Sequence, residues 1–204
     1  MTGQVESPAG ISITQCIVKL MDKIQSDASA FVILLHQTPT DTDADAWSGH
    51  SLADSTELRG SLADRGSHWD LMFKVNQKLE TWAVERLPRA LFSTAQMDSM
   101  DAVIRQRLVD ESPILDQPQS AIRLPSHRLE YLYYEGTIGG DRGTVDRFFE
   151  GSYRLLPPVA NFDATQLRLE IMFRGVDQQK WLFEFQQIDR SNPIHWQLTM
   201  KPMK

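Results

Sequence analysis

The chain has 204 residues, of which 41% are hydrophobic and 24% charged, and this composition is typical of one globular domain with an appendage. Its formal net charge of −6 argues against a surface that coats nucleic acid broadly, although it leaves room for a local basic groove. A single cysteine excludes a disulfide framework, and no apolar run reaches transmembrane length, so we expect a cytoplasmic protein without a membrane partner.

Residues 1–30 form a distinct N-terminal segment. Gly, Ser and Pro up to residue 10 predict a loose tail. Apolar residues then recur at helical spacing with charged residues between them, which predicts an amphipathic helix over about residues 12–26. Two roles stay open for this helix: packing on the domain, or binding a partner or a second copy of the chain.

A continuous apolar run at residues 31–35 predicts a buried strand that ends at His36. The part that follows, about residues 37–67, is rich in Asp, Ser, Thr, Gly and Ala, and it predicts an acidic insertion that is a long loop or partly disordered. Its aspartate run from Asp41 does not match a calcium loop, because Ala46 stands where the sixth-place glycine is required. His50 is expected to be a loop residue, and the alternative is that it replaces His36 as a ligand.

Residues 68–84 predict two strands joined by a tight turn at Asn76 and Gln77. Apolar and polar side chains alternate along the first strand, and side chains two positions apart share a face. One face is therefore apolar and buried, and it consists of Trp69, Leu71, Phe73 and Val75. The other face carries His68 and Asp70, roughly 7 Å apart along the strand. An imidazole beside a carboxylate is half of a metal site.

The rest of the chain predicts one more helix and several strands. Ser93 and Gln96 form a capping-box signature, and an apolar stripe follows it to a helix end near Asp110. A hairpin is expected around Glu150 and Gly151, formed by residues 143–149 and 152–156. Other extended segments are expected at residues 121–124, 129–134, 166–173, 180–188 and 195–200. The tryptophans expected in the core are Trp69, Trp82 and Trp181.

These elements favour a mainly β (α+β) fold, namely an antiparallel β-barrel or a strongly bent sheet flanked by two or three helices. We expect the barrel domain to cover residues 31–190, with the acidic insertion at about residues 37–67. A C-terminal strand or tail over residues 191–204 then completes the chain.

Several short motifs occur in a fixed order along the chain. They are the apolar run that ends in His36, the His68-Trp-Asp motif with Thr81-Trp-Ala-Val after the turn, His127-Arg-Leu-Glu-Tyr, Tyr134-Glu-Gly-Thr-Ile and Arg142-Gly-Thr-Val. Together they resemble the N-terminal 3'-phosphoesterase domain of bacterial DNA ligase D, over about residues 31–188. The resemblance implies a β-barrel flanked by helices. It also implies a stand-alone, metal-dependent phosphoesterase that trims 3'-phosphates or 3'-ribonucleotides from nucleic-acid ends in DNA repair.

The resemblance further implies which residues form the site. The implied metal ligands are His36, His68 and Asp70. The implied ion is divalent and typically Mn²⁺, while imidazole and carboxylate ligands also suit Zn²⁺ or Co²⁺. The other implied site residues are His127 as general acid/base or transition-state donor, Tyr131 as hydrogen-bond donor, and Arg123 and Arg86 as phosphate-gripping cations.

The chain departs from the family pattern mainly at these cations. Met72 and Gln119 stand where the family has arginines. Arg123 lies four residues after Gln119, and because an even offset along a strand keeps the same face, Arg123 is the expected substitute. Arg142, in a glycine-rich turn that is shorter than usual, offers a further cation. His68 also follows His36 by 32 positions, whereas the family separates the two motifs by only a few residues.

The implied partners are nucleic-acid 3' ends, of DNA or of a DNA/RNA primer-template, and separate ligase or repair proteins. Two other functions stay open. Methionine at position 72 favours a catalytically inactive relative that binds nucleic-acid ends or a repair protein. The acidic net charge favours a phosphoesterase for a small phosphorylated substrate. Each histidine also keeps an ordinary structural interpretation, which is the favoured one for His195.

Overall fold

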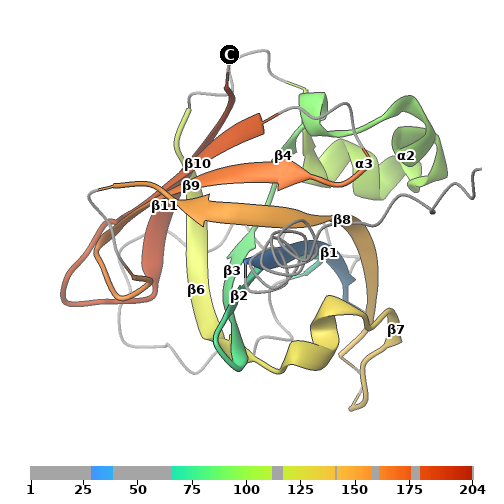
Figure 1. The fold of residues 1–204 in the computed structure, drawn as a ribbon. Coiled ribbons are helices and arrows are strands. Elements are labelled where there is room, and N and C mark those ends of the chain that lie inside the picture. Colours follow the sequence, from blue (N-terminus) through green and yellow to red (C-terminus); the bar gives the residue numbers. More distant parts are fainter. Residues whose placement is uncertain are drawn as a thin grey trace, which may run out of the picture.

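The computed structural model describes residues 29–38, 66–111, 117–140, 142–157, 161–175 and 180–203. The expected N-terminal helix, most of the acidic insertion and His50 lie outside these residues. Within them the chain forms a closed antiparallel β-barrel of eight strands with two short α-helices at one edge (Figure 1). The prediction of a mainly β barrel is therefore confirmed.

The barrel wall follows the order β1, β2, β3, β6, β11, β10, β9 and β8, and β8 pairs with β1 to close it. All of these pairings are antiparallel. The eight strands are β1 (Ala30–Gln37), β2 (His68–Val75), β3 (Lys78–Val84), β6 (Gln119–His127), β8 (Thr144–Leu155), β9 (Gln166–Phe173), β10 (Lys180–Gln187) and β11 (His195–Pro202). Three two-residue strands add to them: β4 (Leu87–Pro88), β5 (Val109–Asp110) and β7 (Gly136–Thr137).

The interior of the barrel is filled with aromatic and branched apolar side chains. Trp69, Trp82 and Trp181 are each at most 1% exposed, which confirms their prediction as core residues. Phe73 lies near the centre and its ring contacts the rings of Phe31, Trp82, Tyr153, Phe162 and Phe185. The main core thus occupies the barrel's inside, and any site must lie on the outer wall or at the ends of the barrel. A smaller apolar cluster lies on the opposite face of the strands, formed by Val32, Leu34, Met72, Leu79, Leu132, Ile138 and Val145.

The predicted hairpin of β2 and β3 is confirmed. Asn76 adopts a left-handed φ of 54° at the two-residue turn, a conformation that asparagine tolerates better than most residues. The structure adds that the polar face of β2 is buried as well, because His68 is only 1% exposed and Asp70 only 3%. Two buried, ionisable side chains on one strand need partners.

The helical region differs from the single helix that was expected. The Ser93 capping box is present and begins α2 (Thr94–Ser99). A second helix, α3 (Ala102–Leu108), begins at Asp101, whose side chain accepts hydrogen bonds from the backbone of Val103 and Ile104. A side chain that caps a new helix ends the previous one, so the apolar stripe spans two helices. None of the helices in the described ranges is long and apolar enough to cross a membrane.

One expected strand and one expected turn were wrong. Residues 129–134 begin with a 3₁₀ helix, η3 (Leu129–Leu132), in which the backbone of Tyr131 donates to the carbonyl of Arg128. Glu150 and Gly151 are not a turn but the middle of the continuous strand β8. Gly151 pairs with Phe31 on one side and Phe173 on the other. A Cβ there would lie 2.0 Å from the Met172 carbonyl oxygen, so the glycine permits close packing rather than chain reversal.

A candidate metal centre on the outer wall

Antiparallel pairing of β1 with β2 brings His36 and His68 together. The two residues are directly opposite each other in the register, and their ring centroids lie 4.8 Å apart. Asp70 is two residues further along β2, opposite Leu34. One ligand atom from each of His36, His68 and Asp70 lies within 4.8 Å of the other two. Strand pairing therefore brings together His36 and His68, which lie 32 positions apart in the sequence.

Backbone carbonyl groups set the orientation of both imidazole rings. Nδ1 of His68 lies 2.9 Å from the carbonyl oxygen of Gly66, and Nε2 of His36 lies 2.7 Å from that of Arg142. Since a carbonyl oxygen only accepts, these two nitrogens carry the hydrogens in the neutral rings. The other nitrogen of each ring, Nε2 of His68 and Nδ1 of His36, then presents its lone pair towards Asp70. Metal-binding histidines are commonly held in this way.

The spacing and the charge of the group fit a cation. The Asp70 oxygens lie 3.8 Å from His36 Nδ1 and 3.5 Å from His68 Nε2, and no hydrogen bond within the described residues reaches Oδ1. Lone pairs and a carboxylate repel one another unless a positive charge lies between them. Ligands at about 2.0–2.2 Å from a tetrahedral ion lie roughly 3.3–3.6 Å apart. The buried His36, His68 and Asp70 group can hold a metal ion.

Electrostatics keep the group in the ligand-competent form. Burial lowers the pKa of His36 below its ordinary value. The negative charge of Asp70 acts in the opposite direction, and the neighbouring His68 lowers the pKa further. Burial by itself raises the pKa of Asp70, but the neighbouring His68, followed by His36 and His127, brings that pKa below its usual value. A deprotonated carboxylate and neutral imidazole are the forms that bind metals.

The metal candidates share one hollow with two other predicted residues. This hollow of about 70 Å³ is lined by His36, Thr38, His68, Asp70, Met72, Leu124, His127, Tyr131, Ile138, Arg142 and Val145. The rings of His127 and Tyr131 meet edge to face at 5.5 Å. Met72, only 1% exposed, forms part of the apolar wall. The structure thus gathers the three expected ligands, His127 and Tyr131 on the outer wall.

Arg123 lies on the other side of that wall. Its guanidinium donates to Glu80 at 2.8 Å and lies 5.3 Å from the Trp82 ring centroid, inside the barrel. The reason is a β-bulge in β6. Leu79 pairs with His127 and Thr81 pairs with Leu124, so two residues of β6, Pro125 and Ser126, lie opposite one residue of β3, Glu80. The bulge reverses the alternation, and residues 123 and 127 therefore face opposite sides despite their even offset.

Arg86 also lies away from the hollow. Its guanidinium donates to the carbonyl oxygens of Arg107 at 2.9 Å and Gln106 at 3.2 Å, near the C-terminal end of α3. The Trp69 indole donates to the next carbonyl, that of Leu108, at 2.8 Å. These bonds satisfy carbonyl groups at the end of the helix, which have no hydrogen-bond partner within the helix. In this position Arg86 holds α3 beside the strand that carries His68 and Asp70.

Two residues were not assigned to the site from the sequence but contribute to it. Arg142 lines the hollow, and its Nε donates to the Gly139 carbonyl at 2.8 Å. Ser67 is fully buried, and its hydroxyl accepts from the backbone of Thr38 at 3.0 Å. That bond joins the chain just after β1 to the chain just before β2. The glycine-rich turn in the sequence pointed to Arg142, but nothing in the sequence pattern indicated Ser67.

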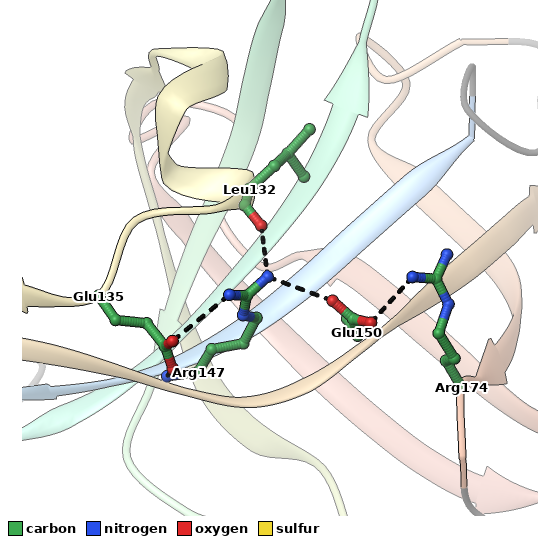
Figure 2. Close-up of polar contacts among 5 residues, drawn as sticks. All are labelled: Leu132, Glu135, Arg147, Glu150 and Arg174. Atoms are coloured by element: carbon green, nitrogen blue, oxygen red, sulfur yellow. Dashed lines mark hydrogen bonds and ion pairs between the residues drawn. The ribbon is translucent and has the colours of Figure 1, made fainter.

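The η3 helix, which carries Tyr131, is held to β8 by Arg147. Its guanidinium donates to the Leu132 carbonyl at 3.0 Å and to Glu150 at 3.2 Å (Figure 2). Arg174 donates to the other oxygen of Glu150 at 2.9 Å. This network places one wall of the hollow relative to the barrel.

No model of a known protein family matches the chain, and no curated protein matches it significantly. The geometry of the hollow, together with the order of the sequence motifs, is therefore the basis for assigning a function.

Proposed function

We propose that the chain is a metal-dependent phosphoesterase that removes a terminal phosphate or ribonucleotide from 3' ends of nucleic acid in DNA repair. The observation that carries the proposal is a single hollow that combines a buried His/His/Asp group with His127, Tyr131 and Arg142. The resemblance of the motif order to the DNA ligase D phosphoesterase domain supplies the substrate. Nucleic-acid 3' ends, and separate ligase or repair proteins, are the partners that this function requires.

Mn²⁺ is the metal that we propose, held by Nδ1 of His36, Nε2 of His68 and the Asp70 carboxylate. Two imidazoles and one carboxylate also suit Zn²⁺ or Co²⁺. A divalent ion supplies positive charge that polarises a phosphoryl oxygen. The carbonyl groups of Gly66 and Arg142 keep both rings oriented for this role.

The remaining residues act on the phosphate and the leaving group. Water attacks phosphorus and passes a proton to solvent, while the ester P–O bond breaks. His127 delivers a proton to the departing 3' oxygen, which leaves as a hydroxyl, and His127 then regains a proton from solvent. Arg142 offsets the negative charge of the phosphoryl oxygens, and Tyr131 donates a hydrogen bond to one of them. Histidine suits the proton transfer because an imidazole nitrogen can both donate and accept a proton.

Two observations favour the rival functions. Arg142 is the one arginine that lines the hollow in the described part of the chain, and Met72 stands in its wall. A weakly cationic hollow favours an inactive relative that binds nucleic-acid ends or a repair protein without turnover. The small hollow and the net charge of −6 favour a small phosphorylated substrate. Weak salt dependence of binding distinguishes the second rival from duplex-end recognition.

The deciding experiment is Mn²⁺-dependent release of the terminal phosphate from a recessed 3'-phosphorylated primer-template. We expect release by the wild type, loss of release in His127→Ala, and retention in His195→Ala, which changes a histidine on β11 outside the hollow. Absence of release by folded wild type that binds Mn²⁺ supports the binding module. Release from glycerol phosphate but not from the primer-template supports the small substrate.

A further inference from the structure

A chain of aromatic rings leads from the hollow to the surface. The Tyr131 ring meets His127 at 5.5 Å on one side and Tyr134 at 5.9 Å on the other, both edge to face. The Tyr134 hydroxyl donates to the carbonyl of Thr137, and 41% of the residue is exposed. The chain of rings therefore ends in an anchored, accessible ring beside the hollow.

Arg147 fixes the backbone on both sides of that ring. Its side chain donates to the carbonyl of Leu132 at 3.0 Å and contacts Glu135 at 3.4 Å, and its backbone N–H donates to Glu135 at 2.9 Å (Figure 2). Tyr133 and Tyr134 lie between these two anchor points. A ring that is already held in place loses little conformational entropy when a ligand stacks on it.

We propose that the Tyr134 ring stacks on the base of the nucleoside whose phosphate occupies the hollow. This inference rests on the proposed function and narrows its substrate to nucleotide ends. The hollow of about 70 Å³ is well below the roughly 300–1,000 Å³ of pockets that enclose a drug-sized ligand, so it does not enclose a nucleoside, and we place only the phosphate in it. The base must then lie outside, one sugar away from the phosphate. Aromatic stacking accepts every base, as end trimming requires.

The test uses a dinucleotide whose terminal 2-aminopurine nucleoside carries a 3'-phosphorothioate, which slows turnover. Fluorescence of 2-aminopurine falls when the base stacks, so the same titration reports affinity and stacking. The variants are Tyr134→Ala, Tyr134→Phe, which keeps the ring, and Tyr133→Ala, which removes a neighbouring tyrosine that is 79% exposed. Affinity for Mn²⁺ and for inorganic phosphate is measured on the same full-length proteins by calorimetry.

We expect the wild type with Mn²⁺ to quench the probe, and Tyr134→Ala to bind it roughly 5- to 140-fold more weakly without quenching, because stacking on one base contributes about 1–3 kcal/mol. Tyr134→Phe keeps the ring but loses its hydroxyl anchor, so it should still quench the probe, with an affinity between those of the wild type and Tyr134→Ala. Tyr133→Ala should behave as the wild type, and every variant should keep its affinity for Mn²⁺ and phosphate. Equal affinity and quenching in Tyr134→Ala overturn the stacking inference and leave the phosphoesterase site standing. A wild type that binds neither phosphate nor probe with Mn²⁺ overturns both.

Discussion

Nε2 of His36 lies 2.7 Å from the carbonyl oxygen of Arg142. One residue thus orients a candidate metal ligand through its backbone and lines the hollow as a cation. The chain between β7 and β8 carries Arg142, so its backbone position affects both functions at once. Gly143, the next residue, decides how closely this chain can approach β1.

Gly143→Ala should destabilise the protein and weaken metal binding. Gly143 has a φ of +92°, and a Cβ there would lie 1.8 Å from the Gln37 carbonyl oxygen. The backbone must therefore move, in addition to the roughly 1–2 kcal/mol that a left-handed conformation costs. Gly140→Ala is the control, because Gly140 also has a positive φ but no atom within 4 Å of the added Cβ. Equal loss of unfolding free energy in urea for the two variants would contradict this explanation.

His68→Ala should abolish high-affinity Mn²⁺ binding without unfolding the barrel. The side chain supplies one of three ligands and is buried beside Asp70, so its loss leaves an incomplete site. Free Mn²⁺ measured by electron paramagnetic resonance during a titration gives the affinity, and circular dichroism checks the fold. His195→Ala is the matched control. Unchanged Mn²⁺ affinity in folded His68→Ala would remove the metal assignment.

Ser67→Ala should reduce stability by about 1–3 kcal/mol, because the buried Thr38 backbone N–H loses the hydroxyl that accepts its hydrogen bond. We also expect Mn²⁺ affinity to fall by up to about tenfold, since the bond aligns the chain beside His36 and His68. Ser99→Ala, at an exposed helix end, is the control. The alignment role fails if Ser67→Ala loses stability but binds Mn²⁺ as tightly as the wild type.

Glu80→Gln should remove a pH-dependent part of the stability. Burial raises the pKa of Glu80, but hydrogen bonds from Arg123 and Lys78 outweigh it and leave the pKa below 4.5. A lowered folded pKa stabilises the protein above the unfolded value, and this contribution is lost as the pH falls through the folded pKa. The difference between wild type and variant, roughly 1–3 kcal/mol at pH 7, should therefore shrink below pH 4.5.

The control for this experiment is Glu130→Gln, which breaks an ion pair between two exposed side chains. Exposed pairs contribute little, so we expect a small difference in unfolding free energy at every pH. A Glu80→Gln difference that stays constant on acidification would show that the carboxylate charge is not the stabilising feature.

Local patterns were sufficient to predict the elements whose side chains alternate regularly. The β2 and β3 hairpin, the capping box at Ser93 and strands β9 to β11 follow from periodicity and from the chemistry of turns and caps. The same alternation placed His68 beside Asp70. His36 was named as a ligand only through the family resemblance, and the pairing of β1 with β2, which was not predicted from the sequence, brings it to the other two residues.

Features that depend on three-dimensional contacts could not be predicted in this way. The bulge in β6 falls at Pro125 and Ser126. A proline inside a strand pattern suggests a bulge or an edge strand, but it does not fix the register, which places Arg123 inside the barrel and His127 outside. Gly151 looked like a turn residue because packing against Met172 cannot be read from one strand. Residues 129–134 have strand-forming composition, but their hydrogen bonds are local. In each case the backbone geometry, and not the side-chain pattern, decided the outcome.

The hollow lies on the outer wall, whereas aromatic side chains fill the inside of the barrel. The same strands therefore serve folding through one face and the proposed chemistry through the other. Proteins often lose activity when they are stabilised, because the active site itself is strained or flexible. Here the main core and the candidate metal ligands consist of different side chains, so substitutions that repack the interior can raise thermal resistance while the hollow keeps its geometry. The barrel is accordingly a favourable starting point for directed evolution.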